Sequence, residues 1–376
     1  MALSIFVDAL PYNEVAAHYR DRFENTQISE LIPNIAYSSS LHWQLYCNQY
    51  PDQRGVLVDW VKEPEKRKSV RIISTLLSPL DGCGDLAVAV RKVLDRYVYR
   101  RNMFANIPFR FRKEFSQKGQ YLFWKENTYR AQSIFEGYAV ISQDEGHKSF
   151  ERTMELLNAA IENGEKNIFA VFGEVDMLGH KCRRGDLYSQ RIQPCVENLL
   201  DAVDRYRFEN PEEEILIVSD HGMSTVKQKV NLGLESRFGR QSGKRYIAYC
   251  DSAVMCLFCG DDRLKMEIRD YLAQRQEGHL LTDAERKKFG ALDPKFGDLI
   301  YILREGHIFA DNWFGKSLRR PGTNGSGMHG FWPERCAKDQ MACVMLVNGR
   351  ETLPETCDYP YAHGVIVRVM KGMDRN

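Results

Sequence analysis

The stretch Ile215-Leu216-Ile217-Val218-Ser219-Asp220-His221-Gly222-Met223 places a carboxylate, an imidazole and a glycine after four consecutive apolar residues. Three of the four are β-branched, which is typical of a strand buried on both faces of a sheet. In open α/β sheets, ligand sites lie just beyond the carboxyl ends of the strands. Adjacent Asp and His at such a point suit zinc or manganese. An acidic helix cap followed by a polar turn residue fits the same letters, so the motif alone leaves both interpretations open.

The composition is that of an ordinary globular protein. The chain has 376 residues, of which 43% are hydrophobic and 27% are charged, so it can bury a sizeable core. Its 52 Lys and Arg residues against 51 Asp and Glu residues give a formal net charge of +1. No overall field therefore favours a nucleic acid polymer or an anionic membrane, and any anion recognition must be local.

The ten cysteines lack the spacing of a small disulfide framework, and several lie in apolar runs, so reduced and buried thiols are expected. We interpret the pair Cys256 and Cys259 as core packing because no second pair accompanies it. The first residues lack the pattern of a signal peptide, and no apolar run reaches transmembrane length. These features predict a cytoplasmic protein without a membrane segment.

Short apolar runs alternate with helical patterns along most of the chain. Strands are predicted at 3–7, 70–73, 168–172, 215–218, 299–303, 343–347 and 365–369, and helices at 12–23, 86–97, 150–162 and 187–206. This order predicts the α/β class, with a doubly wound mixed sheet and helices on both faces. The predicted catalytic core comprises residues 1–228 and 321–376. A small α+β cap is inserted at 229–320, and the Gly-rich loop 321–327 closes it.

Within the first part of the core, a helical excursion of about 84–135 is rich in basic and aromatic residues. Between Arg91 and Trp124, cations such as Arg96, Arg110 and Arg112 are interleaved with rings such as Phe109 and Phe115. Such a surface could grip a phosphorylated or ring-bearing ligand. The alternative is an excursion whose rings pack on the core while its cations are solvated.

Seven polar groups follow strand ends or tight turns: Asp8, Ser38, Asp176, His180, Asp220, His221 and His329. Three carboxylates, three imidazoles and a hydroxyl are enough for two metal ions with open positions. The spacing of Asp176 and His180 lets both reach one ion. With His329 they form a two-His, one-carboxylate set, which leaves the vacant coordination position that catalytic zinc requires.

Here the chain resembles the alkaline phosphatase superfamily, and most nearly its nucleotide pyrophosphatase/phosphodiesterase branch. The matching elements span nearly the whole chain in the family's order: Asp8-Ala9-Leu10, Asp176-x-x-Gly179-His180, Ser219-Asp220-His221-Gly222-Met223 and His329-Gly330-Phe331. The resemblance implies an alkaline-phosphatase-like fold and two divalent metal ions, with zinc favoured and manganese as the alternative. It also implies the two ligand sets: Asp176, His180 and His329 for one ion, and Asp8, Asp220 and His221 for the other.

In this family a Ser or Thr nucleophile lies close to both ions. The stretch 50–55 resembles the family's Tyr-Pro-x-x-His-Gly element, and counting back from it places the nucleophile at Ser38, with Ser39 as the alternative. His42 matches the His of the family's Phe-Pro-Asn-His element, whereas Leu41 stands in place of the Asn. We therefore predict Ser38 as nucleophile and metal ligand, and Ser39 and His42 as substrate-binding residues.

The sequence thus predicts a metal-dependent phosphoester hydrolase, preferentially a phosphodiesterase, that forms a phosphoserine intermediate. Its substrate would be small and phosphorylated: a nucleotide, a sugar or a lipid head-group ester. A phosphomonoesterase, or a phosphotransferase or mutase, is the alternative on the same site. A catalytically silent, metal-stabilised binding protein is the alternative of another class. The seven groups speak against it, because a structural metal site needs four ligands and no open position.

Overall fold

The computed structural model describes residues 2–83, 85–99, 107–117, 129, 132–146, 148–181, 185–310, 327–333 and 338–372. Most of the predicted Gly-rich loop 321–327 lies outside these residues, as do 100–106 and 118–128 of the basic and aromatic stretch. None of the helices in the described ranges is long and apolar enough to cross a membrane.

The chain divides into two compact units. The first comprises residues 1–50, 121–226 and 325–376, and the second comprises residues 51–120 and 227–324. The predicted cap, 229–320, falls within the range of the second unit, which also takes in residues 51–120.

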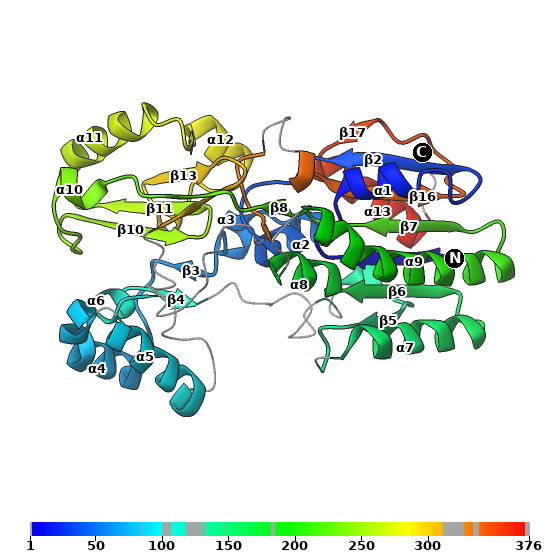
Figure 1. The fold of residues 1–376 in the computed structure, drawn as a ribbon, viewed down its shortest axis with the longest axis horizontal. Helices are drawn as coiled ribbons and strands as arrows, with labels where there is room; N and C mark the ends of the chain where they lie inside the picture. The colour runs from blue at the N-terminus through cyan, green and yellow to red at the C-terminus, as the bar shows by residue number, and fades with distance from the viewer. Residues whose placement is uncertain are drawn as a thin grey trace. The chain divides into compact units, whose positions relative to one another are not determined.

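The first unit is built on a seven-stranded sheet with helices on both faces (Figure 1). Its strands are β1 (Ala2–Val7), β2 (Thr26–Leu31), β5 (Ala139–Ser142), β6 (Asn167–Phe172), β7 (Glu214–Val218), β16 (Ala342–Val347) and β17 (Thr356–Cys357). Its helices are α1 (Tyr12–His18), α2 (Ser38–Cys47), α7 (Phe150–Glu162), α8 (Glu174–Lys181), α9 (Gly185–Glu209) and α13 (Tyr359–Lys371). Shorter elements are η4 (Ser133–Phe135), η6 (Lys338–Gln340) and a two-stranded ribbon of β8 (Ser224–Thr225) and β15 (Gly327–Met328).

The sheet is mixed, with the strand order β17-β2-β16-β7-β1-β6-β5. β1 lies between β6 and β7 and is parallel to both. β5 extends this parallel set beside β6, whereas β16 is antiparallel to its neighbours β7 and β2. The predicted doubly wound mixed sheet is confirmed. Because β1, β6 and β7 are parallel neighbours, their carboxyl ends meet at one edge of the sheet.

Alternating side chains of the central strands fill two cores, one on each face of the sheet. In β1, Leu3, Ile5 and Val7 face the core formed with α1, α7 and α9. Ala2 and Phe6 of the same strand face the core formed with α2 and α13. Burial on both faces explains why these strands appear in the sequence as continuous apolar runs.

Residues 365–369 form part of a helix, and the predicted strand there is wrong. They lie in α13, whose buried residues recur at intervals of three and four positions: Ala362, Val365, Ile366, Val369 and Met370. This is the period of a helix with one face against a sheet. The β-branched residues suggested a strand, but the spacing of the apolar positions determines the structure.

The second unit contains a four-stranded antiparallel sheet in the order β10-β11-β13-β12. The strands of the second unit, which also include the two-stranded pairs β3 with β4 and β9 with β14, are β3 (Trp60–Val61), β4 (Ser116–Gln117), β9 (Gln228–Val230), β10 (Tyr246–Asp251), β11 (Val254–Cys259), β12 (Gly278–Leu280), β13 (Leu299–Leu303) and β14 (His307–Phe309). Its α-helices are α3 (Pro51–Arg54), α4 (Lys68–Leu77), α5 (Asp85–Val93), α6 (Phe109–Arg112), α10 (Leu234–Phe238), α11 (Asp262–Ala273) and α12 (Asp283–Lys288). Shorter helical turns are η1 (Ser78–Cys83), η2 (Leu94–Tyr99) and η5 (Pro294–Phe296). The predicted strand at 70–73 is wrong, because these residues lie in α4.

Residues 107–117 of the basic and aromatic stretch are largely packed inside the second unit, whereas Tyr97 is exposed. Phe109, Phe111 and Phe115 are buried, as the packing interpretation expects. Arg112 differs from that interpretation because it is fully buried rather than solvated. Its Nη2 lies 2.7 Å from Oε2 of the buried Glu65, and its guanidinium lies 4.4 Å from the centroid of the Trp60 ring.

We predict that Glu65→Gln lowers the free energy of unfolding by about 3 kcal/mol, because it leaves the buried Arg112 charge without its counterion. Burial acts to raise the pKa of Glu65, but hydrogen bonds from Arg67 and the charge of Arg112 lower it to about 2. The pair therefore stabilises the folded chain fully above the ordinary Glu pKa, near 4.3, and loses this effect as pH falls toward 2.

Urea denaturation at pH 7 and pH 3 measures this effect, and the difference between the two proteins should shrink at pH 3. The control is Glu267→Gln, which removes an exposed pair with Arg263 (3.1 Å) and should cost less than about 1 kcal/mol. Equal losses in the two variants would contradict the prediction.

Candidate metal centre

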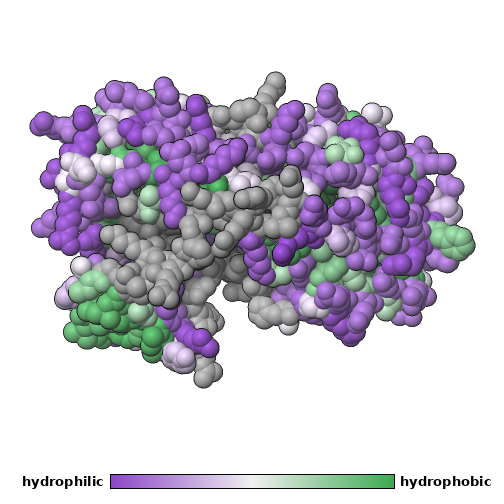
Figure 2. Space-filling model, in the orientation of Figure 1, coloured by the Kyte–Doolittle hydropathy of each residue, from purple (hydrophilic) through white to green (hydrophobic). Residues whose placement is uncertain are grey.

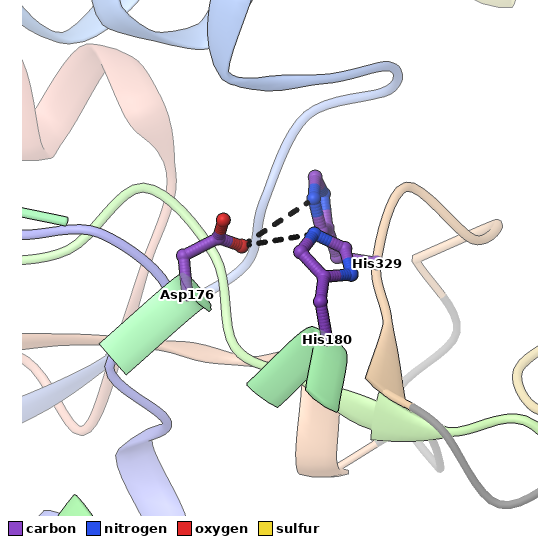
Figure 3. A group of neighbouring side chains, drawn as sticks. All are labelled: Asp176, His180 and His329. Carbon is purple, nitrogen blue, oxygen red and sulfur yellow. Dashed lines mark ion pairs between the residues drawn. The ribbon is translucent and has the colours of Figure 1, made fainter. Parts of the chain in front are cut away.

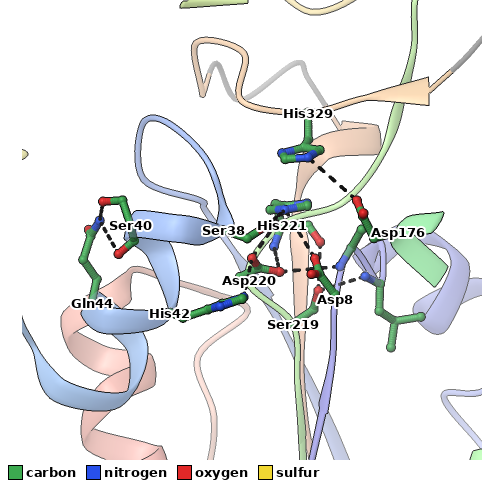
Figure 4. A network of polar contacts seen from close by, with 12 residues as sticks. Asp8, Ser38, Ser40, His42, Gln44, Asp176, Ser219, Asp220, His221 and His329 are labelled. Atoms are coloured by element: carbon green, nitrogen blue, oxygen red, sulfur yellow. Dashed lines mark hydrogen bonds and ion pairs between the residues drawn. The ribbon is translucent and has the colours of Figure 1, made fainter. Parts of the chain in front are cut away.

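The carboxyl ends of three neighbouring parallel strands carry acidic side chains. Asp8 follows β1 directly, and Asp220 lies two residues after the end of β7. After β6, helix α8 begins at Glu174 and carries Asp176 in its first turn. The sheet order brings these three carboxylates together, although they are far apart in the sequence (Figure 4).

The turns after β1 and β7 are joined by Ser219. Its Oγ accepts a hydrogen bond from the backbone N–H of Leu10 (2.8 Å) and donates to the carbonyl of His221 (2.8 Å). Ala9, the residue after Asp8, has a φ of 61°, in the left-handed region that residues with a side chain rarely adopt. Such backbone conformations persist where the surrounding structure enforces them, and they cluster at functional sites.

The first group of side chains at the site comprises Asp8, Ser38, His42, Asp220 and His221 (Figure 4). Asp220 is fully buried in it. Its Oδ2 lies 3.3 Å from His42 Nε2 and 3.4 Å from His221 Nε2. His221 Nε2 is also 3.5 Å from Asp8 Oδ1 and 2.9 Å from Ser38 Oγ. Ser38 is the first residue of α2, so a helix N-terminus meets the two carboxylates at this imidazole.

Asp176, His180 and His329 form the second group (Figure 3). Asp176 and His180 lie one turn apart on α8, with 3.3 Å between Oδ1 and Nε2. His329 Nε2 lies 3.7 Å from the same oxygen. The ring of His329 stacks on that of His221, with centroids 3.7 Å apart and planes 10° apart, so the two groups adjoin.

The three carboxyl groups repel one another where they ionise together. Burial, together with the charges of Asp220 and Asp176, raises the pKa of Asp8 well above its ordinary value. Burial also acts to raise the pKa values of Asp176 and Asp220, but the neighbouring imidazoles outweigh it and lower both pKa values. These shifts disfavour the simultaneous ionisation of all three carboxyls and favour two charged groups beside a protonated Asp8.

Two imidazoles of the site have opposite pKa shifts. Burial and the neighbouring His221 lower the pKa of His329 well below its ordinary value, so this ring is neutral at pH 7 and has a free lone pair. For His180 the carboxylate of Asp176 outweighs burial and raises the pKa to about 9. His180 must lose a proton before its Nε2 can bind a cation.

The site has the donor atoms and the unsatisfied charge that divalent cations require. Ligand atoms lie within 4.8 Å of one another in three groups: Asp176, His180 and His329; Asp8, Asp176 and His221; and Asp8, His42 and Asp220. Asp8 Oδ1, Asp176 Oδ1 and Asp220 Oδ2 are buried without a hydrogen-bond partner among the described residues. Buried carboxylate oxygens are normally paired or bind metals, and this mixture of oxygen and nitrogen suits zinc. The residues present therefore fit the metal ions that the sequence implies.

Two glycines of the sequence motifs allow close approach around the site. A Cβ on Gly222 would clash with the backbone carbonyl of Asp339. Gly330 follows His329 with a φ of 80°, and a Cβ there would lie 2.6 Å from the ring of Tyr37, beside the start of α2. Both glycines are therefore needed for packing as well as for the turns that carry the histidines.

The structure brings together all seven residues predicted from the motifs, and their individual roles stay predictions. His42 and Ser39, predicted to bind substrate, also lie in this region, with the His42 ring buried at the edge of Phe6 and directed at Asp220. Sequence reasoning missed this contact and the role of Tyr359, whose hydroxyl donates to the backbone carbonyl of Asp220 (2.5 Å). No local motif identifies Tyr359. Ser219 directly precedes the Asp-His pair, so its role could have been predicted from the sequence.

Solved structures of ectonucleotide pyrophosphatase/phosphodiesterase 5 match the whole chain. An inactive form of the murine protein in complex with AMP has a TM-score of 0.61 at 12% sequence identity, over 100% of this chain and 96% of that chain. The chain has their alkaline-phosphatase-like fold. The murine protein and the human protein, both also 12% identical over the same shares, have TM-scores of 0.60 and 0.59. Neither a protein-family model nor a curated protein matches the sequence.

We predict that the purified protein holds two divalent transition metal ions per chain and that His329→Ala holds about one. His329 belongs to the second group alone, and the loss of one ligand weakens that site most. The control is His279→Ala, which removes a half-buried imidazole paired with Glu285 in the second unit and should leave two ions. Elemental analysis of the three proteins measures the stoichiometry. Equal metal content in all three would contradict the assignment.

Proposed function

We propose that the protein is a metal-dependent phosphodiesterase that uses Ser38 as its nucleophile and belongs to the nucleotide pyrophosphatase/phosphodiesterase branch of the alkaline phosphatase superfamily. The observation that carries the proposal is the position of Ser38 Oγ. It lies at the N-terminus of α2 and 2.9 Å from His221 Nε2, beside the adjoining ligand groups. The fold shared with phosphodiesterases supports the same reaction class.

In this proposal Asp176, His180 and His329 hold one cation, and Asp8, Ser38, Asp220 and His221 hold the other. Zinc is favoured because imidazole and carboxylate ligands in this ratio suit it, and manganese is the alternative. When bound, the two ions supply Lewis acidity that activates the serine hydroxyl and offsets charge on the phosphoryl oxygens.

Ser38 then gives up its hydroxyl proton to solvent and forms a bond from Oγ to phosphorus, while the bond from phosphorus to the oxygen of the leaving alcohol breaks and that oxygen takes up a proton. The N-terminus of α2 offers the backbone N–H groups of Ser38 and Ser39 to the phosphoryl oxygens, whereas those of Ser40 and Leu41 donate to the carbonyl of Tyr37. Water afterwards cleaves the phosphoserine, releasing the phosphate ester and restoring the hydroxyl. Ser39 and His42 follow Ser38 on α2, and we propose that they bind the substrate.

The charge around the site supports a diester as substrate. Among the described residues, the groups that most strongly shift the pKa values of Asp8, Asp176 and Asp220 are other site residues and Asp144. No lysine or arginine is among them. A monoester brings a second negative charge that favours an added cation, whereas a diester brings one charge and a second substituent. We propose a nucleotide, sugar or lipid head-group diester.

Two other functions are compatible with the same site. A phosphomonoesterase or phosphotransferase would use the same serine and the same cations. A silent binding protein would hold the cations without turnover. We further propose a reducing compartment, the cytoplasm, because the eight cysteines that the structure describes are all free thiols.

We predict that Ser38→Ala lowers kcat by at least roughly 10³-fold while metal content and melting temperature stay close to those of the original protein, because it removes covalent catalysis and leaves Asp8, Asp220 and His221 to hold the cation. Ser39→Ala is the matched control on the next residue and should keep most of the activity. Initial rates on a nitrophenyl diester measure both variants. If Ser39→Ala is the inactive one, the nucleophile is Ser39.

We predict a higher kcat/KM for a mono-4-nitrophenyl diester than for 4-nitrophenyl phosphate, measured in one buffer with the same metal. The physical reason is the single charge of the diester at a site whose described surroundings are acidic. A monoester advantage above tenfold corresponds to about 1.4 kcal/mol of transition-state preference, and it would favour the phosphatase alternative. No turnover of either ester by the metal-loaded protein would favour the silent binding protein.

A further inference from the structure

The exposed apolar side chains of the protein are concentrated in one short part of the chain. Of the ten large hydrophobic side chains that are exposed among the described residues, six lie between positions 72 and 98: Ile72, Leu76, Leu86, Val93, Tyr97 and Val98. Their exposed fractions run from 53% to 71%. Figure 2 shows a continuous hydrophobic area over the region that Figure 1 labels α4, α5 and α6. Single exposed apolar residues are ordinary, but a gathered patch marks an interaction surface.

These residues do not hold the helices together. In α4 the inward side chains Val70, Ile73 and Leu77 pack in a small core of the second unit. Ile72 and Leu76, spaced by four positions, lie on the other side of the same helix and are exposed. The outer face of α4 therefore has apolar residues that contribute nothing to this core.

The segment that follows repeats this arrangement. Ala87 and Leu94 belong to the same small core, whereas Leu86, Val93 and Tyr97 are exposed. The exposed positions are spaced by seven and four residues, which places them on one side of a helix. Two successive helical segments thus each present an apolar outer face.

The charges around these apolar residues have one sign. Among the described side chains of residues 66–98, the exposed charged ones are all basic: Lys66, Arg67, Lys68, Arg71, Lys92 and Arg96. Arg67 is paired with the buried Glu65, so the other five supply the charge of this face. The two carboxylates of this range whose side chains the structure describes, Asp81 and Asp95, are engaged elsewhere. Both oxygens of Asp81 accept backbone N–H groups at the start of α6, and Asp95 is buried.

We propose that the outer face of α4, α5 and η2 is a docking surface for an anionic lipid bilayer. Apolar residues enter the boundary between head groups and acyl chains, and the surrounding cations contact anionic head groups. Long basic side chains suit this arrangement because their stems cover apolar surface while their charges reach the head groups. A second copy of the chain fits less well, since a symmetric interface would place the same cations opposite one another.

Flotation of the full-length protein with vesicles tests this proposal. Vesicles of phosphatidylcholine with phosphatidylglycerol should bind the protein, and vesicles of phosphatidylcholine alone should bind it far less. Added salt should weaken the binding, because it screens the cations. The assay measures binding without turnover, so its result is independent of the proposed hydrolase activity.

Three variants separate the apolar contribution, the charge contribution and the background. Ile72→Ser with Leu76→Ser should weaken binding at least roughly tenfold. Lys68→Ala with Arg71→Ala should weaken it about 25-fold, or about fivefold for each cation near the surface. The control Phe208→Ser removes an 85% exposed ring on α9 of the first unit and should bind like the original protein. All three should keep the circular dichroism spectrum and the melting temperature, because the altered side chains are exposed.

Equal binding of the original protein to neutral and anionic vesicles, or no binding to either, would overturn the proposal. So would anionic binding that survives both double substitutions. Analytical ultracentrifugation completes the test. A self-associating protein that becomes monomeric with Ile72→Ser and Leu76→Ser would assign the face to a second copy of the chain and contradict the lipid assignment.

Discussion

The arrangement of the site depends on the burial of the Asp220 carboxylate at the end of a central strand. An isolated buried carboxylate is very unfavourable, so it persists only where partners are supplied. The structure supplies the imidazoles of His42 and His221, and the Tyr359 hydroxyl bonds to the backbone carbonyl of Asp220. These partners come from α2, the turn after β7 and α13, so the core on the face of the sheet that α2 and α13 cover must assemble before the carboxylate is accommodated.

The need of buried carboxylates for partners also explains why the site suits divalent cations. Three carboxyl groups meet where β1, β6 and β7 end, and burial together with their mutual repulsion raises the pKa of Asp8. Imidazoles offset part of this repulsion, but one buried oxygen of each carboxyl group has no hydrogen bond from the residues that the structure describes. Helices and strands of the packed core fix these groups in position. Electrostatic strain of this kind is expected at functional sites, because packing elsewhere in the fold compensates for it.

The central strands of the sheet were the elements best predicted from the sequence. β1, β6 and β7 are buried on both faces, so their apolar runs were visible, and the polar residue after each run could be placed at one edge. β2, with the alternating sequence Thr26 to Leu31, and the short β5 were missed because polar residues interrupt or shorten their patterns. The predictions at 70–73 and 365–369 failed where β-branched residues were read without their helical spacing.

Parts of the site that depend on packing between distant segments could not be read from the sequence. The contact between His42 and Asp220 joins residues 178 positions apart, and nothing local marks Tyr359 as a partner of the same aspartate. The sequence motifs identify side chains that follow strand ends, since chain geometry places those together once the sheet order is known. The contacts that orient those side chains, such as those of His42 and Tyr359 with Asp220, depend on how the helices pack.

A net charge of +1 conceals two opposite local environments, because the composition averages over surfaces that never act together. The strand ends gather carboxylates that each have a buried oxygen, whereas the exposed charges described in residues 66–98 are all cations. At physiological ionic strength, charges act over about 8 Å, so a bound ion or an approaching surface experiences only its nearest groups. The neutral total therefore rules out long-range attraction to anions and leaves contact recognition open. Which residues share a face, and not how many of each sign the chain contains, determines the partners that it can bind.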